Sequence, residues 1–440
     1  MIPAAAAHPF RALGVRNFRL FALGQVVSVA GTWMSVVAQD WLVLGLTGNS
    51  ATALGTVTAL QFTPVLLCTL YGGRLADRHD KRTLLTAANL VSGLLALLLA
   101  VLVLSGGVSL AHINLFALGL GLVNSVEVPT RMAFIGELVG PELLPNASAL
   151  SAAYFSVARV AGPAVAGLLI SVAGTGWVLL LNGLSYAATV LALRRMRPDE
   201  LHRGAEPAGR VRVADGLRYV RSRPDLMVPL ALVAGVGLFG LNFQLTLPLL
   251  AKTVFHADAA SFGLLTTAFA AGSLVAAFLT TARRTRPSAR LVTVAALVFA
   301  ALETATGWAP GYAAAVVLLF LTGGASLYFA QAANHRVQLG SDSRFRGRVL
   351  ALYALILQGS TPLGALLVAR IGAEWGARAC LVAGGLASLL VGLGALCPRA
   401  GRSGPEPPER DAAAEPARRQ RSRSPGRRRD PADGGPWTGG

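Results

Sequence analysis

Charged residues are scarce in this chain. Asp, Glu, Lys and Arg make up only 14% of its 440 residues, while 54% are hydrophobic, and a soluble domain carries about 25% charged residues. Three cysteines, Cys68, Cys380 and Cys397, form no CxxC pair and no metal-ligand spacing, so we interpret them as small packing residues. No Ser/His/Asp or Cys/His arrangement stands out. These absences argue against a soluble protein and an enzyme, and we expect neither a cofactor nor a metal.

Twelve apolar stretches dominate what is present. Each is long enough to cross a hydrocarbon core of about 30 Å, which takes roughly 20 helical residues. The stretches lie at about 18–46, 51–73, 84–105, 111–135, 147–172, 176–193, 226–252, 260–281, 291–308, 311–333, 349–370 and 377–397. The start of the chain runs directly into the first stretch, which we expect to stay in the membrane rather than to be cleaved as a signal peptide. The sequence therefore predicts an all-α membrane protein with twelve transmembrane helices.

Basic residues gather on one side of this topology. Of the 39 Lys and Arg residues, 35 lie in or beside the N-terminal segment, every second gap and the tail. Because translocation disfavours cationic loops, we expect this side to be cytoplasmic, with both termini on the cytoplasmic side of a plasma membrane. The net charge of +18 is explained by this topology, so no nucleic-acid partner is expected.

A long basic gap divides the stretches six and six. We expect a cytoplasmic N-terminal segment (1–17), a first six-helix bundle (18–193) and a cytoplasmic linker (194–225). A second six-helix bundle (226–397) and an Arg-rich cytoplasmic tail (398–440) follow. In the linker, Val213, Leu217 and Val220 alternate with Arg218 and Arg221, which favours either a short amphipathic interfacial helix or a plain solvated linker. The tail has no apolar periodicity and is expected to be disordered. It either touches anionic lipid or is simply solvated.

The two halves share one feature. A Gly/Pro cluster surrounds Pro163 in the fifth stretch and Pro362 in the eleventh. Proline removes a helical hydrogen bond and kinks the helix, while Gly and Ala permit close approach of helices. Interrupted helices at matching positions of two halves indicate moving elements around a central site.

The most specific motif follows the second stretch and reads Gly72-Gly73-Arg74-Leu75-Ala76-Asp77-Arg78-His79-Asp80-Lys81-Arg82. An acid among basic residues can accept Arg hydrogen bonds or face a helix N-terminus, which makes a breakable lock. The segment resembles the loop motif G-x-L-A-D-R-x-G-R-[RK] of the major facilitator superfamily, with Asp80 in place of the second Gly. The resemblance implies that Gly73, Asp77, Arg78 and Arg82 form a conformational gate. The alternative is a loop that only sets topology.

Two further resemblances narrow the family. The run Gly162-Pro163-Ala164-Val165-Ala166-Gly167 is similar to the G-P-x-x-G-G motif of antiporters in the superfamily, with Ala166 in place of one Gly. It implies a helix-kink role for Gly162, Pro163 and Gly167, with Pro362 as the counterpart in the second half. The segments AQDWLVLGLTGNS, LQFTP and EVPTRMAF look like the enterobactin-exporter-like subgroup, which exports siderophores, macrolides and other small molecules. The Arg that drug/proton antiporters often carry early in the fourth span is absent from NLFALGLGLVN.

Four charges lie inside the stretches: Asp40, Glu127, Arg159 and Glu303. Each costs roughly 2.5–3.5 kcal/mol at the bilayer centre and is functional by default. A lone Arg159 is hard to tolerate, so we expect Glu127 to pair with it, either for coupling or as a structural ion pair. Because burial disfavours a carboxylate, Asp40 and Glu127, and then Glu303, are candidates for proton binding. The alternative for Asp40 and Glu303 is a polar residue near a helix end.

These features together predict a monomeric secondary transporter of two six-helix bundles in the lipid bilayer. Its expected activity is proton-coupled efflux of a small hydrophobic or amphipathic molecule, such as a drug, macrolide or siderophore, by alternating access. The alternatives are a facilitator, importer or lipid flippase on the same fold, and a membrane sensor that does not transport. The second half offers no second complete gate, because the corresponding loop, ARRTRPSAR, lacks the Gly and the Asp.

Overall fold

A computed structural model describes residues 10–202, 213–281 and 285–396, and every regular element in these ranges is helical. This confirms the all-α class. The elements are η1 (Arg11–Gly14), α1 (Arg16–Leu46), α2 (Ala51–Arg78), α3 (Lys81–Leu104), α4 (Leu110–Ala173), α5 (Thr175–Arg194), η2 (Pro198–Glu200), α6 (Val213–Arg221), α7 (Pro224–Phe239), α8 (Phe243–Leu249), the π-helical turn η3 (Leu250–Val254), α9 (Ala259–Thr281), α10 (Ala289–Gly307), α11 (Tyr312–Gly340) and α12 (Arg346–Leu396). The tail expected at 398–440 lies outside the described residues.

Within the described ranges, ten helical segments are long and apolar enough to cross a membrane, and two of them are too long for one crossing. The 64 residues of α4 would extend ~96 Å at 1.5 Å per residue, about three times the thickness of a hydrocarbon core. Backbone breaks divide α4 at Gly140 (φ 70°) and α12 at Gly376 (φ 81°), a conformation that glycine adopts without strain. Counting the two sides of each break as separate crossings gives the expected twelve.

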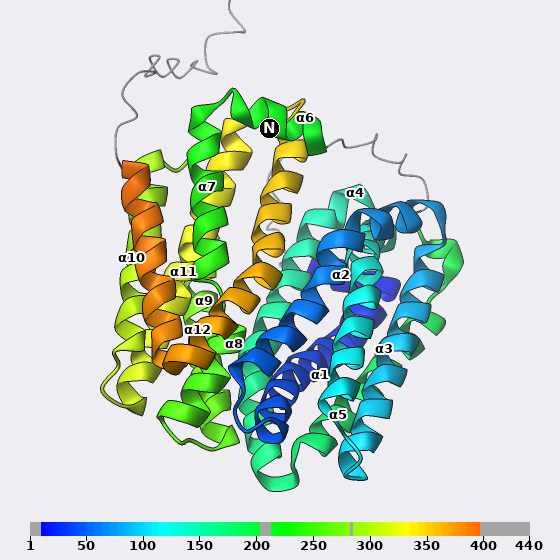
Figure 1. The fold of residues 1–440 in the computed structure, drawn as a ribbon. Helices are drawn as coiled ribbons and strands as arrows, with labels where there is room; N and C mark the ends of the chain where they lie inside the picture. Colours follow the sequence, from blue (N-terminus) through cyan, green and yellow to red (C-terminus); the bar gives the residue numbers. More distant parts are fainter. Residues whose placement is uncertain (1–9, 203–212, 282–284, 397–440) are drawn as a thin grey trace, which may run out of the picture. The chain divides into compact units, whose positions relative to one another are not determined.

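The helices form two groups that follow the halves of the chain (Figure 1). Helices α1–α5 pack among themselves, and so do α7–α12. The most extensive contacts between the groups join α4 to α9 and α12 to α2. In terms of the expected crossings, the fifth crossing of each half lies against the second crossing of the other. The same contact therefore occurs twice, as an internal repeat requires.

Small residues allow the close approach between the two groups. A Cβ at Gly167 of α4 would lie 2.6 Å from the carbonyl oxygen of Ala259, and a Cβ at Gly55 of α2 would lie 3.0 Å from that of Ala365. The Thr267 hydroxyl donates to the carbonyl oxygen of Val160 at 3.1 Å. Such packing between small residues is a main source of helix association where lipid removes the hydrophobic driving force.

The two groups are joined towards one end. We call the end that carries residues 79–80, 195–202, 213–223, 285–288 and 341–345 the basic end, and the other the less basic end. The hydrogen bond, ring contacts and glycine contacts found between the groups in the described ranges lie between mid-depth and the less basic end.

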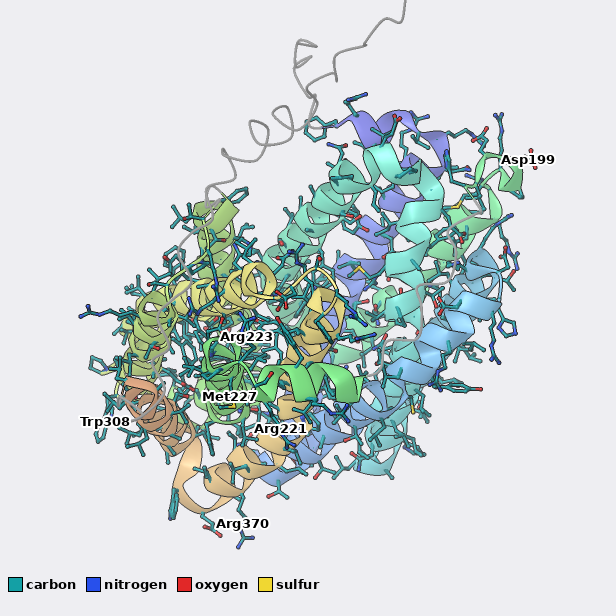
Figure 2. All side chains as sticks on the ribbon, turned by 90° about the horizontal axis from the view of Figure 1, so that it is seen from above. Asp199, Arg221, Arg223, Met227, Trp308 and Arg370 are labelled. Atoms are coloured by element: carbon teal, nitrogen blue, oxygen red, sulfur yellow. The ribbon has the colours of Figure 1, made fainter. Side chains whose placement is uncertain are left out.

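Tryptophans mark the less basic end. Trp177 lies in the first turn of α5, Trp308 follows α10 and Trp375 precedes the break in α12, and all three are exposed. Seen from above, Trp308 lies on the outer edge of the second group (Figure 2). Exposed Trp side chains at one level are typical of a membrane–water interface, where the ring is partly apolar and its N–H remains wet. The apolar outer faces of helices such as α3, with Leu90, Leu94 and Leu98 exposed, fit the same membrane setting.

A helix occupies the linker where either a helix or a plain solvated segment was expected. It is α6, and Figure 1 shows it at the basic end, beside the start of α7. Its Tyr219 ring stacks on Phe345, with centroids 4.5 Å apart, and its hydroxyl donates to Asp342 Oδ2 at 2.9 Å. These contacts bind the described part of the linker to the second group of helices, at the start of α12.

Candidate transport cavity

The first of two adjoining cavities lies between the two groups of helices and has a volume of about 300 Å³. Its walls are mostly apolar and aromatic, with Trp33 of α1, Phe243 of α8 and Phe269 of α9 among them. Two charged side chains, Asp40 and Arg159, also reach it. We call it the apolar cavity. Aromatic walls with few polar groups are typical of sites for small organic molecules.

The second cavity, of about 280 Å³, is lined mostly by the first group, with Gln244 and Gln358 of the second group, and we call it the polar cavity. Amide side chains line much of it: Gln25, Gln39, Gln61, Asn89, Asn124, Asn182, Gln244 and Gln358. Trp33, Val36 and Gln244 line both cavities, so the two adjoin. Many lining residues of the polar cavity, such as Gln25 and Asn89, belong to the helix halves nearer the basic end.

Asp40 of α1 is almost completely buried, with 3% of its surface exposed. It faces the apolar cavity and forms no ion pair with any described residue. A buried carboxylate without a cation is costly, so such a group favours its protonated form. The position therefore suits a residue that gains or loses a proton with its surroundings.

Arg159 lies in the same cavity but does not form the expected ion pair with Glu127. Instead, its guanidinium carbon lies 5.8 Å from the centroid of the Trp33 ring, and Glu127 pairs with Arg131 at 3.1 Å. The reason is local geometry, because residues four apart on one helix face are neighbours without any further packing. The indole face partly replaces the missing acid through a cation–π contact.

The Glu127–Arg131 pair lines the polar cavity, where both side chains remain only slightly exposed. Sequence reasoning identified the acid and missed Arg131, although the i,i+4 spacing was a signal. Tyr186 also lines this cavity, with its hydroxyl 3.5 Å from that of Thr32. The polar cavity therefore combines one ion pair with many hydrogen-bonding groups.

The residues of the gate motif lie at the basic end, mostly within α2. Gly73, Asp77 and Arg78 belong to the last turns of this helix, and Asp77 is exposed and makes no hydrogen bond or ion pair with the described residues. Arg82 instead binds the end of α5, donating to the carbonyl oxygens of Leu193 at 2.7 Å and Arg194 at 3.1 Å. In this conformation the motif is bound within its own half through Arg82, while Asp77 is available.

Asp80, the departure from the family motif, has a structural role. Its carboxylate accepts hydrogen bonds from the backbone N–H and the hydroxyl of Thr83 at 2.8 and 3.0 Å, so it caps α3. A glycine would leave this N-terminus without a side-chain acceptor. Relative to the glycine of the family motif, Asp80 therefore makes the turn less flexible and fixes the start of α3.

The second half has an acid at the basic end that sequence reasoning missed. Asp225, in the first turn of α7, accepts hydrogen bonds from both Arg223 and Arg286, each at 2.9 Å. Bonding to this carboxylate raises the pKa of Arg223. Arg286 belongs to the loop that lacks an acid of its own, and Asp225 is far from it in sequence, so a comparison of loops could not find the pair.

At the less basic end, three residues bridge the groups. The rings of Trp41 in α1 and Phe262 in α9 stack with centroids 5.8 Å apart, and Lys252 Nζ of η3 lies 4.8 Å from the centroid of Trp41. We call these residues the aromatic bridge. It adds a specific contact to the glycine packing that joins the groups at this end.

The kink motif of α4 lies at the contacts between helices. A Cβ at Gly162 would lie 2.6 Å from Trp33 Cβ, while Gly167 faces α9, and Pro163 lines the apolar cavity. In α12, Pro362 is buried. Both prolines lie in helices that form the contacts between the two groups.

Glu303 of α10 is 2% exposed and lines neither cavity. Asn242 likewise lies behind the apolar cavity, where its amide donates to the carbonyl oxygen of Leu238 at 2.9 Å. Within the described ranges, no group of three or more His, Cys, Asp or Glu side chains could hold a metal ion.

Two packed groups of membrane-length helices with a cavity between them define a membrane transporter of the major facilitator fold. The chain belongs to the family described as transmembrane secretion effector, whose model matches residues 6–402. This confirms the resemblance to the superfamily and identifies the chain as a membrane transporter.

Named relatives include exporters and pumps. The chain is 26% identical to the multidrug efflux pump Tap of Mycolicibacterium fortuitum, over 85% of this chain and 93% of the pump. It is 26% identical to the enterobactin exporter EntS of Citrobacter koseri, over 86% of this chain and 90% of the exporter. It is also 26% identical to the staphyloferrin A transporter of Staphylococcus aureus, where the match spans 56% of this chain and 62% of that protein.

Solved structures agree on the fold. A bacterial homologue of the iron transporter ferroportin in an inward-facing state superposes with a TM-score of 0.67 at 15% identity, covering 86% of this chain and 98% of the other. The D-xylose–proton symporter superposes with a TM-score of 0.65 at 12% identity, covering 86% and 97%. At such low identity these likenesses concern the fold alone.

Proposed function

We propose that this transporter exports a small amphipathic molecule in exchange for protons. The observation that carries the proposal is the apolar cavity, which one buried carboxyl group and one guanidinium line together with aromatic walls. A cavity of this kind can hold an organic molecule while a proton is gained or lost beside it. The names of the pump and exporter relatives support the outward direction.

The substrate is expected to combine an apolar body with an anionic or strongly polar group. Arg159 has no carboxylate partner among the described residues, and it lies over Trp33 inside an apolar cavity. A guanidinium so placed favours carboxylate, phenolate or hydroxyl groups of a ligand, because bonds to a charged donor are strong where water is excluded. The aromatic walls take up the apolar part.

Asp40 is the proposed carrier of the coupling proton. It shares the cavity with Arg159 and is buried, so its proton is lost when the cavity becomes wet or when a cation approaches. Protonation from outside and release inside would follow the proton gradient, and substrate would move outward in exchange. Glu127 is the second candidate, although it is paired with Arg131.

The gate motif is proposed to close the basic end when the protein turns outward. The contacts between the groups lie towards the less basic end, and Asp77 is available for a partner at the basic end. Asp77 and Arg78 would then bind the second group when that end closes, and Arg82 would keep the motif attached to α5. In this proposal the basic end faces the cytoplasm, and both termini lie on the cytoplasmic side of the plasma membrane.

The test is transport in proteoliposomes with amphipathic dyes of anionic, neutral and cationic type, read together with internal pH. An imposed proton gradient is expected to drive dye movement by the wild type, with proton flow in the opposite direction. Asp40→Asn should lower gradient-driven transport by about tenfold or more, yet leave downhill exchange of dye, since the cavity remains. The matched control is Asp199→Asn, an exposed residue of η2 on the outer edge of the first group (Figure 2).

The alternatives predict different results. A facilitator, importer or lipid flippase on this fold would move its substrate without response to the imposed pH gradient. A sensor would bind dye and transport none. If Asp40→Asn retains full coupling, Asp40 is not the proton carrier, whichever direction transport takes.

A further inference from the structure

The seventh crossing is interrupted beside the apolar cavity. Helix α7 ends at Phe239 and α8 begins at Phe243. The Val236 carbonyl oxygen accepts from the backbone N–H groups of both Gly240 (2.8 Å) and Leu241 (3.1 Å). The amide of Asn242 donates to the carbonyl oxygens of Leu238 and Phe239. Residues 240–242 thus form an ordered break, and interrupted helices of transporters commonly hold ions.

Glu303 lies on the far side of this break from the cavity. Gly240 and Gly384 provide the space for its carboxyl group: a Cβ at Gly240 would lie 2.7 Å from Oε2, and one at Gly384 would lie 2.9 Å from Oε1. Glu303 Oε2 is buried and finds no hydrogen-bond partner among the described residues, and neither does the hydroxyl of the fully buried Ser388. A ring atom of Phe299 lies 2.8 Å from the same Gly240 position. The carboxyl group is therefore enclosed by backbone, one hydroxyl and an aromatic ring.

No cation among the described residues neutralises Glu303. The helices packed against α10 are α7, α11 and α12, and their charged or titratable side chains near this level are bound to other groups. Arg378 donates to the carbonyl oxygens of Gly307 and Ala309, Cys380 to that of Val368 and Tyr312 to that of Ser261, while Arg370 pairs with Glu374. The other charged or titratable side chains of these helices lie nearer the basic end: Asp225 of α7, Tyr328, His335 and Arg336 of α11, and Arg346, Arg348 and Tyr353 of α12.

The neutral form of Glu303 fits these surroundings. A carboxylate here would lack both a counter-ion and a full set of donors, which disfavours the charged form. The C-terminal end of α7 also carries partial negative charge at its carbonyl oxygens, which disfavours an anion and favours a cation. A proton bound to the carboxylate removes its unpaired negative charge, suits the negative end of α7, and needs less space than any other cation.

We propose that Glu303, with Ser388 and the break at residues 240–242, forms a proton-binding site in the second half, separate from the apolar cavity. The site holds its proton while the break covers it and releases the proton when the break moves. This use of the site in transport rests on the proposed function, whereas the protonation of Glu303 does not.

The break connects the two sites physically. Leu241, Phe243 and Gln244 line the apolar cavity, and the backbone of the same segment covers Glu303. The Phe243 ring also contacts Phe299, with centroids 6.2 Å apart, and Phe299 belongs to the same helix as Glu303. A molecule in the cavity that displaces Phe243 would therefore shift the cover of the carboxyl group. Both sites would then bias the same two-state element, which is the physical requirement for coupling.

Infrared spectroscopy of the full chain in lipid nanodiscs tests the protonation directly. A neutral buried carboxylic acid gives a C=O stretching band that a carboxylate does not give. At neutral pH, Glu303→Gln is expected to lose part of this band, while the matched control Glu374→Gln, an acid of α12 paired with Arg370, keeps it. Glu303→Asp retains an acid and should retain the band, which covers the case in which Glu303→Gln does not fold. A band unchanged in Glu303→Gln overturns the proposal.

A second arm distinguishes a proton from a sodium ion. Sodium chloride is exchanged for choline chloride at constant pH and ionic strength, and the Glu303 band is expected to stay constant. Loss of the band in sodium overturns the proton assignment. In proteoliposomes, Glu303→Gln should lose proton-driven dye transport and keep downhill exchange. Full proton-driven transport in Glu303→Gln, with the band assigned to Glu303, would show a protonated acid that coupling does not use and would overturn its role in transport alone.

Discussion

At the scale of single residues, Arg159 sets the expected choice of substrate. The change Arg159→Gln removes the one cation that lines the apolar cavity in the described structure. Binding of anionic amphipathic dyes should weaken by about tenfold or more, which corresponds to ~1.4 kcal/mol, while neutral dyes lose little. Arg159→Lys should fall between the two, because it keeps the charge and loses the planar contact with Trp33.

The measurement is dye fluorescence titration on purified protein. Arg370→Gln is the matched control, since Arg370 is exposed at the less basic end and lies on the outer edge of the second group (Figure 2). Equal weakening of anionic and neutral dyes in Arg159→Gln would contradict a charge-specific role and indicate a general loss of packing.

The sequence could place charges inside the membrane but could not pair them. Its pattern located Asp40, Glu127, Arg159 and Glu303 inside the apolar stretches, each long enough to cross a membrane. Pairing across helices depends on the rotation of each helix, which twelve largely aliphatic stretches do not encode in their periodicity. The Glu127–Arg131 pair was the exception that the sequence did encode, since it needs only one helix.

At the scale of elements, glycines decide how closely α4 and α9 approach. A Cβ at Gly167 would lie 2.6 Å from the carbonyl oxygen of Ala259, whereas Gly136 of the same helix has open space around its Cβ position. Gly167→Ala should destabilise the protein by ~1–3 kcal/mol through overpacking. Gly136→Ala should stabilise it by up to about 1 kcal/mol through helix propensity.

Thermal unfolding in detergent measures the stability changes of the two variants, which are expected to have opposite signs. The two variants introduce the same methyl group into the same helix, so a difference between them reports the contact and not the composition. A Gly167→Ala variant that melts at or above the wild-type temperature would contradict the close packing of α4 on α9.

Elements were predicted better than their connections. Apolar length located most ends of the long helices within a few residues, since membrane thickness fixes how many residues a crossing needs. It could not show that α7 and α8 are separated at residues 240–242, because the interruption carries little change in hydropathy. Nor could it show that Asn242 caps the end of α7, where its side-chain amide donates to the carbonyl oxygen of Leu238.

At the scale of the whole molecule, the aromatic bridge is expected to hold the less basic end closed. Trp41 contacts both Phe262 and Lys252 of the other group, so Trp41→Ala removes both contacts at once. Stacking and cation–π contacts contribute about 0.5–2 kcal/mol each, and the loss of both shifts a two-state equilibrium by roughly one to three orders of magnitude. The variant should therefore populate a state open at the less basic end.

Distances between spin labels at Thr47→Cys and Ala257→Cys, on a background without Cys68, Cys380 and Cys397, measure the opening. The wild type is expected to give a short-distance population, and Trp41→Ala should add a longer one. Trp308→Ala, which removes an exposed Trp at the same end, should leave the distances unchanged. If Trp41→Ala also leaves them unchanged, glycine packing between α4 and α9 and between α2 and α12 suffices to close this end, and the bridge has no role in setting the conformation.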